Sequence, residues 1–267
     1  GFRTKNGSIR TPQSIQSYAT LATIIFQTNQ NEQHGGQAIP AFDFFMAKGV
    51  AKSFRKHLSS FINFYVAMEN GIQADEKAIR TLIKEYLPSI QSGERERETL
   101  RIALIALQII IDKEHLTRIA EKAYQQTKKD THQAMEGFIH NLNTMHSRGG
   151  NQVVFSSINY GTDTSAEGRL VIEELLKATI EGLGTRGEVP VFPIQIFKVK
   201  DGVSYSEKDF EKAMGAENIE DAMRGTYEAP NFDLLLRACQ TTSKALFPNF
   251  MFLDTPFNKN EKWKADD

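Results

Sequence analysis

The stretch from His146 to Gly161 reads H-S-R-G-G-N-Q-V-V-F-S-S-I-N-Y-G and joins two different patterns of apolar residues. Before it, Thr131–Met145 places apolar side chains at helical spacing, which predicts an amphipathic helix. Gly149 and Gly150 then permit backbone conformations that are closed to other residues. After them, the apolar and β-favouring segment Val153–Phe155 predicts a buried strand. The stretch therefore predicts a helix that leads into a flexible polar loop, from which a strand leaves.

Polar side chains gather on both sides of this glycine pair. The strand is expected to end in two hydroxyls and an amide, which is the chemistry of a binding site and not of a core. The alternative is a plain connection between a helix and a strand, which is what most Gly-Gly turns are. The candidate binding residues of the stretch are Ser147, Arg148, Gly149, Gly150, Asn151, Gln152, Ser156, Ser157 and Asn159.

A second glycine pair stands in a similar setting near the beginning of the chain. Thr11-Pro12 predicts a helix start, with a hydroxyl cap followed by proline, and the helix is expected to run to about Gln30. His34-Gly35-Gly36-Gln37 follows it and leads into a short extended segment. The repeated order of helix, Gly-Gly loop with glutamine and extended segment suggests two loops with related roles.

Composition limits the class of protein. The 267 residues suit one large α/β domain or two smaller ones, with 40% apolar and 24% charged residues. A net charge of -1 argues against nucleic-acid or membrane partners. The longest apolar run, Ile102–Ile111, is too short for a membrane span, and no secretory signal is recognisable, so a cytoplasmic location is expected. Neither end looks like a natural terminus, which suggests a piece of a longer protein.

Helices are expected to dominate the first half of the chain. The aromatic-rich segment Phe42–Met68 is interpreted as core packing. Within about 72–128, helices are predicted over Ala74–Leu87 and Glu94–Ile111. This part is interpreted as a helical excursion that supports the site without lining it.

Strands and helices alternate in the second half. Thr164–Glu167 is interpreted as a capping box that opens a helix through Ile180. Strands are predicted at Val191–Phe197 and Phe250–Leu253, with a helix over Phe232–Leu246 between them. Strands separated by helices in this way predict a mainly parallel α/β barrel or sheet.

Metal and thiol chemistry are not expected from this chain. His132, Glu136 and His140 share a helix face, but the two histidines are separated by about 12 Å along the helix, which is too far for the paired ligands of zinc proteases. Cys239 is the only cysteine, which excludes an internal disulfide and a multi-cysteine metal site. It is interpreted as a packing residue of its helix.

Several motifs, in family order, resemble those of the anaerobic (class III) ribonucleoside-triphosphate reductases, which are glycyl-radical enzymes. They are H-G-G-Q from His34, N-L-N-T-M-H-S-R-G-G-N-Q from Asn141, F-S-S-I-N-Y-G-T-D-T-S from Phe155, F-P-I-Q-I-F-K-V-K from Phe192 and F-P-N-F-M-F-L-D-T-P-F-N from Phe247. The resemblance implies roughly the first half of a ten-stranded α/β barrel made of two five-stranded halves. It implies conversion of ribonucleoside triphosphates to deoxyribonucleoside triphosphates, with ATP and dNTP effectors.

The resemblance also implies the cofactors and partners of the whole enzyme. These are a glycyl radical, zinc, formate as reductant, a radical-SAM activating enzyme and a second copy of the chain. The finger-loop cysteine, the glycyl-radical and zinc region and any ATP-cone are expected outside this chain, so the piece alone is expected to be inactive. The alternative is a non-catalytic dNTP-binding regulatory or interaction module.

By the same resemblance, the two Gly-Gly loops correspond to loops that carry effector identity to the substrate pocket. Glycine allows the several backbone states that such a loop needs, and amides such as Gln37, Asn151 and Gln152 can donate or accept hydrogen bonds. Arg148 can stack on a base or pair with phosphate. The helices before the two loops are expected to pack together and to help form the homodimer.

Overall fold

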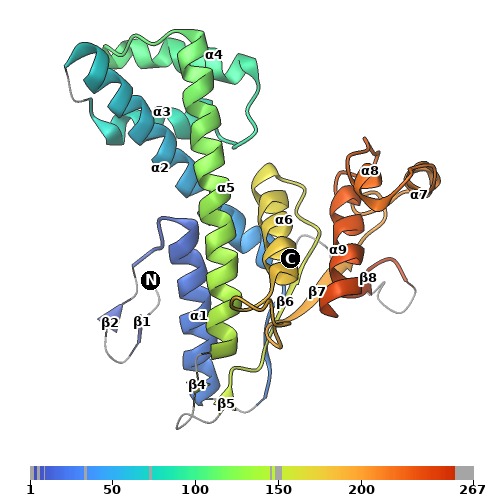
Figure 1. Ribbon diagram of the computed structural model, residues 1–267. Coiled ribbons are helices and arrows are strands. Elements are labelled where there is room, and N and C mark those ends of the chain that lie inside the picture. The colour runs from blue at the N-terminus through green and yellow to red at the C-terminus, as the bar shows by residue number, and fades with distance from the viewer. Residues whose placement is uncertain are drawn as a thin grey trace.

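The computed structural model describes residues 3–4, 7–8, 10–32, 35–71, 74–144, 146–147 and 152–255. The helices are α1 (Ile15–Glu32), α2 (Phe42–Asn70), α3 (Glu76–Tyr86), α4 (Glu94–Leu104), the 3-10 helix η1 (Ile105–Leu107), α5 (Lys113–Thr144), α6 (Ala166–Glu181), α7 (Glu207–Met214), α8 (Ile219–Met223) and α9 (Phe232–Ala245). The strands are β1 (Arg3–Thr4), β2 (Gly7–Ser8), β3 (Gln37–Ile39), β4 (His146–Ser147), β5 (Gln152–Val153), β6 (Ser156–Tyr160), β7 (Ile194–Val199) and β8 (Asn249–Phe252). Figure 1 shows long helices beside a sheet, with a helical lobe above them.

The main sheet has four parallel strands in the order β3-β6-β7-β8 among the described residues. In register, Ala38 pairs with Ser157, Ile158 with Gln195, and Phe197 with Phe250. Each connection between neighbouring strands contains a helix, as parallel strands require. The expectation of a mainly parallel α/β arrangement is therefore confirmed for this part of the chain. The pairs β1-β2 and β4-β5 are short and antiparallel.

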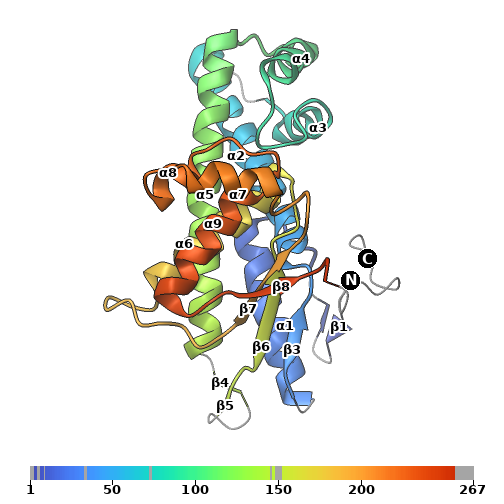
Figure 2. The same ribbon diagram turned by 90° about the vertical axis from the view of Figure 1, so that its right-hand side faces the viewer.

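Helices cover one face of the sheet. Along β6, Ile158 and Tyr160 are fully buried, whereas the alternating residues Ser157 and Asn159 are only half-buried. The buried side chains face the helical layer, because Tyr160 Oη bonds to Gln195, which in turn bonds to α6. Figure 2 looks onto the other face, where the strands lie in front of α1, α5 and α6. We call this the open face.

The core lies between the helices and the covered face. One stripe of α2 is buried at helical spacing, and the ring centroid of its first member, Phe42, lies 5.0 Å from that of Phe138 of α5. Phe138 also contacts Phe26 of α1 at 6.4 Å, so α1 and α5 pack together as expected. Of the aromatic residues of α2, Phe42 and Phe54 are buried and Phe45, Phe61 and Tyr65 pack against the core as interpreted, whereas Phe44 and Phe64 are exposed.

Tertiary contacts move two helix starts away from their predicted positions. α1 begins at Ile15 and not at Thr11-Pro12, because the Ile15 N–H finds an acceptor in Ser53 Oγ of α2 at 2.9 Å. In α6 the cap is Ser165, whose Oγ accepts the Gly168 N–H. The predicted capping box fails because Glu167 accepts the Ile90 N–H at 2.8 Å instead.

The helical lobe contains α3, α4 and the adjoining parts of α2 and α5 (Figure 1). α3 over Glu76–Tyr86 agrees with the predicted helix. α4 ends at Leu104 and not at Ile111 as predicted, because η1 follows it and Gln108 has a positive φ of 59°. α5 runs through residue 128 as one helix of 32 residues to Thr144. No proline interrupts it.

The cysteine of α9 is exposed to solvent. Cys239 lies in α9 as predicted but is exposed, because α9 buries the stripe that contains Leu235, Ala238 and Thr241 and leaves Cys239 beside it. The interpretation of Cys239 as a packing residue is therefore wrong.

No helix in the described ranges is long and apolar enough to cross a membrane.

Candidate functional site

The two Gly-Gly loops lead into neighbouring strands. The Gln37 N–H donates to Phe155 O at 3.1 Å, and Gln37 pairs in register with Ser156. Gly35 and Gly36 directly precede β3, while β4 and β5 precede β6 and contact α1 and α5 respectively. Figure 1 shows the ends of α1 and α5 with β4 and β5 at the lower end of the molecule. The structure thus brings the flanks of both loops to the N-terminal edge of the sheet.

Part of the predicted site lies outside the described residues. This applies to His34, Arg148, Gly149, Gly150 and Asn151. Ser147 and Gln152 flank the second loop, and their backbones pair with each other between β4 and β5. The roles assigned to these residues stay predictions.

Gln37 connects β3 to α1. Its side-chain amide nitrogen donates to Phe26 O at 2.8 Å and lies 3.4 Å from Gln30 Oε1. The residue is 9% exposed, so the amide nitrogen is held inside the protein. The first Gly-Gly loop is therefore fixed at its C-terminal end to the helix that precedes it.

Ser156 and Ser157 lie at the beginning of their strand and not at its end. The predicted strand over Val153–Phe155 is divided, since Val153 pairs with His146 in the small β4-β5 ladder and the sheet strand starts at Ser156. The Ser156 hydroxyl donates to Val154 O, and that of Ser157 to Gln37 O at 3.4 Å. Both hydroxyls therefore belong to the N-terminal edge, near the two loops.

Asn159 carries an unused acceptor on the open face. Its side-chain Oδ1 is buried and has no hydrogen-bond partner among the described residues. Ile196 is its neighbour across β7, and two residues further along β7 the Lys198 ammonium donates to Pro40 O at 2.7 Å. Burial lowers the pKa of Lys198 from its ordinary value, and nearby Asp43 opposes this shift. The open face thus offers an amide oxygen and an ammonium group toward its C-terminal edge.

Asp43 holds the corner between β6 and α6, a role that the sequence did not indicate. Its Oδ2 accepts the backbone N–H groups of Gly161, Thr162 and Asp163 at 2.8, 3.1 and 3.1 Å. The side chain is 0% exposed, and burial raises the pKa of this carboxyl while the backbone donors lower it. An acidic residue in the first turn of a helix already has an ordinary explanation in the helix dipole, so no local signal distinguished Asp43.

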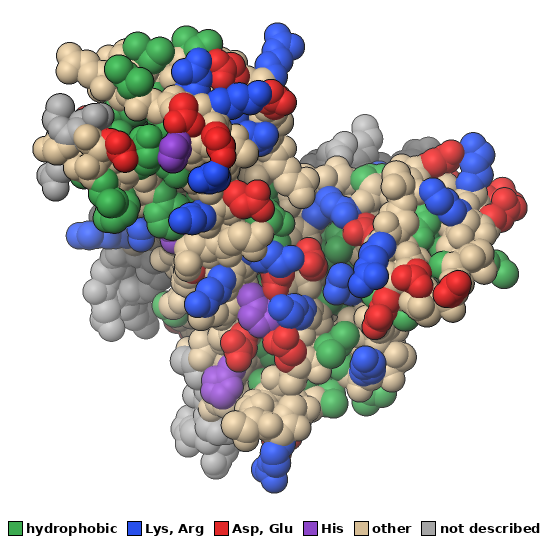
Figure 3. Space-filling view, turned by 45° about the horizontal axis from the view of Figure 1, so that its top comes forward, with side chains coloured by type: hydrophobic (Ala, Val, Ile, Leu, Met, Phe, Trp, Pro, Cys, Tyr) green, Lys and Arg blue, Asp and Glu red, His purple; other side chains and the backbone are tan. Residues whose placement is uncertain are grey.

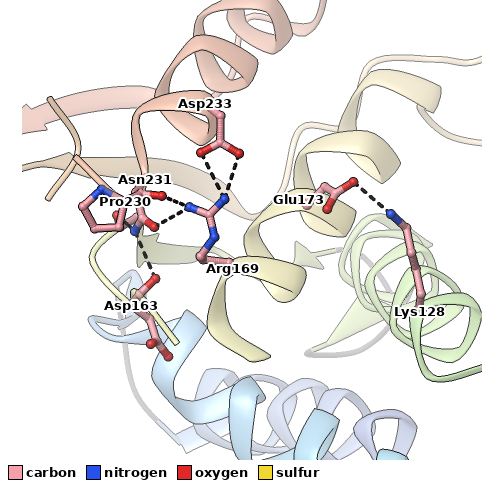
Figure 4. Close-up of polar contacts among 8 residues, drawn as sticks. Lys128, Asp163, Arg169, Glu173, Pro230, Asn231 and Asp233 are labelled. Atoms are coloured by element: carbon pink, nitrogen blue, oxygen red, sulfur yellow. Dashed lines mark hydrogen bonds and ion pairs between the residues drawn. The ribbon is translucent and has the colours of Figure 1, made fainter. Parts of the chain in front are cut away.

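Asn231 holds the same corner from the carbonyl side. Its side-chain nitrogen donates to Gly161 O and Asp163 O, both at 3.0 Å. Arg169 of α6 donates to Asn231 Oδ1 and to Pro230 O, and pairs with both carboxylate oxygens of Asp233 (Figure 4). These contacts tie the start of α9 to the first turn of α6.

Asn143, in the last turn of α5, positions the chain that enters β7. Its Oδ1 accepts the N–H groups of Val191 and Phe192 at 2.9 and 3.1 Å, and its nitrogen donates to Phe192 O. These bonds explain why β7 begins at Ile194 and not at Val191, where the sequence predicted it. Asn143 lies within the N-L-N-T-M-H motif, so the motif contains at least one structural residue.

Replacing Asn143 with alanine is expected to lower the free energy of unfolding by about 2 kcal/mol, because two N–H groups lose their acceptor. Urea unfolding of the two proteins measures the difference. The neighbouring change Thr144→Ala serves as the control. Among the described residues its exposed hydroxyl bonds to His140 O of the same helix, and its loss is expected to cost about 0.5 kcal/mol or less. Equal losses in the two variants would contradict the role given to Asn143.

Side-chain contacts to acidic residues connect α5 to α6. The two ring nitrogens of His132 lie 3.0 Å from Glu174 and 3.0 Å from Glu181, and Lys128 pairs with Glu173 at 3.0 Å (Figure 4). Within the described part of the chain, no group of three His, Cys, Asp or Glu residues could hold a metal. Figure 3 shows acidic and basic side chains interspersed over the visible face. Beside these pairs lies a cleft of about 390 Å³, lined in part by Gln133, Glu136, His140 and Gly182–Gly184.

In the part of the chain that the structure describes, these features define an α/β protein whose parallel sheet is covered by helices on one face and open on the other. The chain belongs to the anaerobic ribonucleoside-triphosphate reductase family, whose family model matches residues 1–267. The protein of that name from Haemophilus influenzae is 24% identical over 99% of this chain, that from Salmonella typhimurium 23% over 95%, and that from Enterobacteria phage T4 23% over 94%. The chain spans 26–30% of the length of these relatives.

Proposed function

We propose that this chain is part of the catalytic barrel of a reductase that converts ribonucleoside triphosphates to deoxyribonucleoside triphosphates by radical chemistry and so supplies DNA precursors. The observation that carries the proposal is the match of the family over the whole chain. The four parallel strands with helices on one face support the barrel, because a barrel segment has its helices outside and its other face turned inward. The proposed location is the cytoplasm.

The substrate is assigned to the open face and the effector to the N-terminal edge. Asn159 Oδ1 and the Lys198 ammonium supply an acceptor and a cation for a polar, anionic ligand. At the other edge, the flanks of both Gly-Gly loops lie together, so ATP or a dNTP bound there contacts both loops at once. The contact between α1 and α5 supports their proposed place in a homodimer interface.

The cofactors of the whole enzyme are assigned to other parts of the protein. A four-thiolate zinc site does not fit this chain, which has one cysteine, and that cysteine is exposed on α9. We therefore assign the zinc, the glycyl radical, the formate chemistry and the contact with the radical-SAM activating enzyme to residues outside this chain. No chemical step is assigned to its side chains.

The proposal is tested by replacing Gly149 and Gly150 with alanine in the full-length protein. Reduction of each of four ribonucleotides is then measured with each dNTP. Coupling between two sites is typically about 1–3 kcal/mol, so restricting the connecting loop is expected to change effector preference about fivefold or more. A folded variant with the unaltered preference pattern would refute the role of the loop. A full-length wild-type protein that binds dNTPs but reduces nothing would favour the non-catalytic binding module instead.

A further inference from the structure

The corner between β6 and α6 has the arrangement by which proteins bind anions. Three consecutive backbone N–H groups, those of Gly161, Thr162 and Asp163, converge on one point between the end of a parallel strand and the start of a helix. Such convergent N–H groups attract phosphates and carboxylates, and a helix N-terminus adds a favourable dipole. In α/β sheets, this edge is also where ligands usually lie.

In this protein the anion at that point is its own side chain. Asp43 Oδ2 occupies the point where the three N–H groups meet, and the residue is completely buried. Of the N–H groups that follow, Ser165 N donates to Asp163 Oδ1 and Gly168 N to Ser165 Oγ. These five N–H groups are therefore already bonded within the protein and are not available to an external phosphate.

The same corner is also fixed through its carbonyl groups. Asn231 binds the carbonyl oxygens of Gly161 and Asp163, so the chain is held from both sides by residues distant in sequence. Asn159 lies two residues before Gly161 on β6, with its Oδ1 buried and unpaired. The position of this acceptor consequently depends on how Asp43 and Asn231 hold the corner.

We propose that Asp43 fills the anion site of the β6-α6 corner, so that a nucleotide on the open face meets this corner through a neutral hydroxyl or amide group and not through phosphate. Asp43 and Asn231 then act as positioning residues for Asn159. A phosphate near this edge binds to the Lys198 ammonium instead. The inference rests on the proposed function for the identity of the ligand, whereas the filling of the anion site does not depend on it.

The first experiment tests the filled site without any activity measurement. Asp43→Gly in the full-length protein removes the carboxymethyl group and leaves the three N–H groups without an acceptor. Thermal unfolding is followed in sodium acetate and in sodium chloride of equal ionic strength. Acetate is expected to raise the Tm of Asp43→Gly by about 2–4 °C and to leave that of the wild type unchanged. An equal shift in both proteins, or none in the variant, would overturn the assignment.

The second experiment tests positioning in the full-length enzyme. Asp43→Asn replaces one acceptor oxygen by a donor, and Asn231→Ala removes both bonds to the corner carbonyls. Each change is expected to raise the KM for the ribonucleotide about tenfold or more, since a shift of about 1 Å in a positioned group can have effects of that size. Asp75→Ala, which removes a helix cap in the helical lobe, is the control and is expected to lower the Tm without changing the KM.

The two experiments can fail independently of the proposed reductase function. Corner variants with the wild-type KM, in an enzyme whose wild type is active, would refute the positioning role. If the wild type reduces no ribonucleotide, the proposed function fails, and the acetate experiment still decides whether Asp43 occupies an anion site.

Discussion

Replacement of Gly161 with alanine is expected to lower the free energy of unfolding by about 3 kcal/mol. Gly161 has φ of +119°, a conformation that L side chains rarely adopt. A Cβ added there would lie 2.8 Å from Lys198 O and 3.1 Å from the Phe197 ring. Both neighbours belong to β7, so the methyl group can be accommodated only by separating β6 from β7. Urea unfolding measures the loss.

The control for this prediction is Gly202→Ala. Gly202 also has a positive φ, +72°, but no atom lies within 4 Å of its added Cβ. Only backbone strain is expected, at about 1 kcal/mol. If the two variants lose equal stability, the close approach of β7 to Gly161 does not matter and the prediction is wrong.

Gly168→Ala is expected to have an effect of similar size for a different reason. The added Cβ would lie 2.1 Å from Asp163 Cγ and 2.2 Å from its Oδ2. Asp163 is 4% exposed, and its Oδ1 accepts the Ser165 N–H at 2.8 Å. To make room, the carboxylate must leave this position and give up that bond, and we expect a loss of about 3 kcal/mol.

Gly137→Ala is the matched control, with an effect of opposite sign. Gly137 lies inside α5, and nothing lies within 4 Å of its added Cβ. Alanine has the higher helix propensity, so this change is expected to stabilise the protein by about 0.5–1 kcal/mol. Thermal unfolding of both variants checks the pair of predictions. A stabilised Gly168→Ala protein would mean that Asp163 is not confined by α6.

Local sequence patterns were sufficient to predict most helices and strands of the fold. Apolar periodicity indicated the helices and the parallel α/β class. Element starts were less accurate, because the contact of Ile15 with Ser53 and that of Glu167 with Ile90 connect residues far apart in the sequence. No local pattern contains such contacts.

In the candidate site, too, features of the local sequence were predictable and contacts between distant residues were not. The two Gly-Gly loops were found from composition, and the structure brings the residues beside them to one edge of the sheet. Asp43 was not found, because the N–H groups that it binds are 118–120 residues away in the sequence. Ser156 and Ser157 were assigned to the wrong end of their strand, because Val153 and Val154 have the strand propensity that normally marks a sheet strand.

The length of α5 has a mechanical consequence. At 1.5 Å per residue, its 32 residues form a rod of about 48 Å that begins in the helical lobe and ends at Thr144. Lys128 and His132 lie near the middle of this rod, where their contacts with Glu173 and Glu174 fix it to α6. Phe138 and Asn143 hold its lower half as well, so one continuous helix connects the lobe to the chain that enters the second Gly-Gly loop.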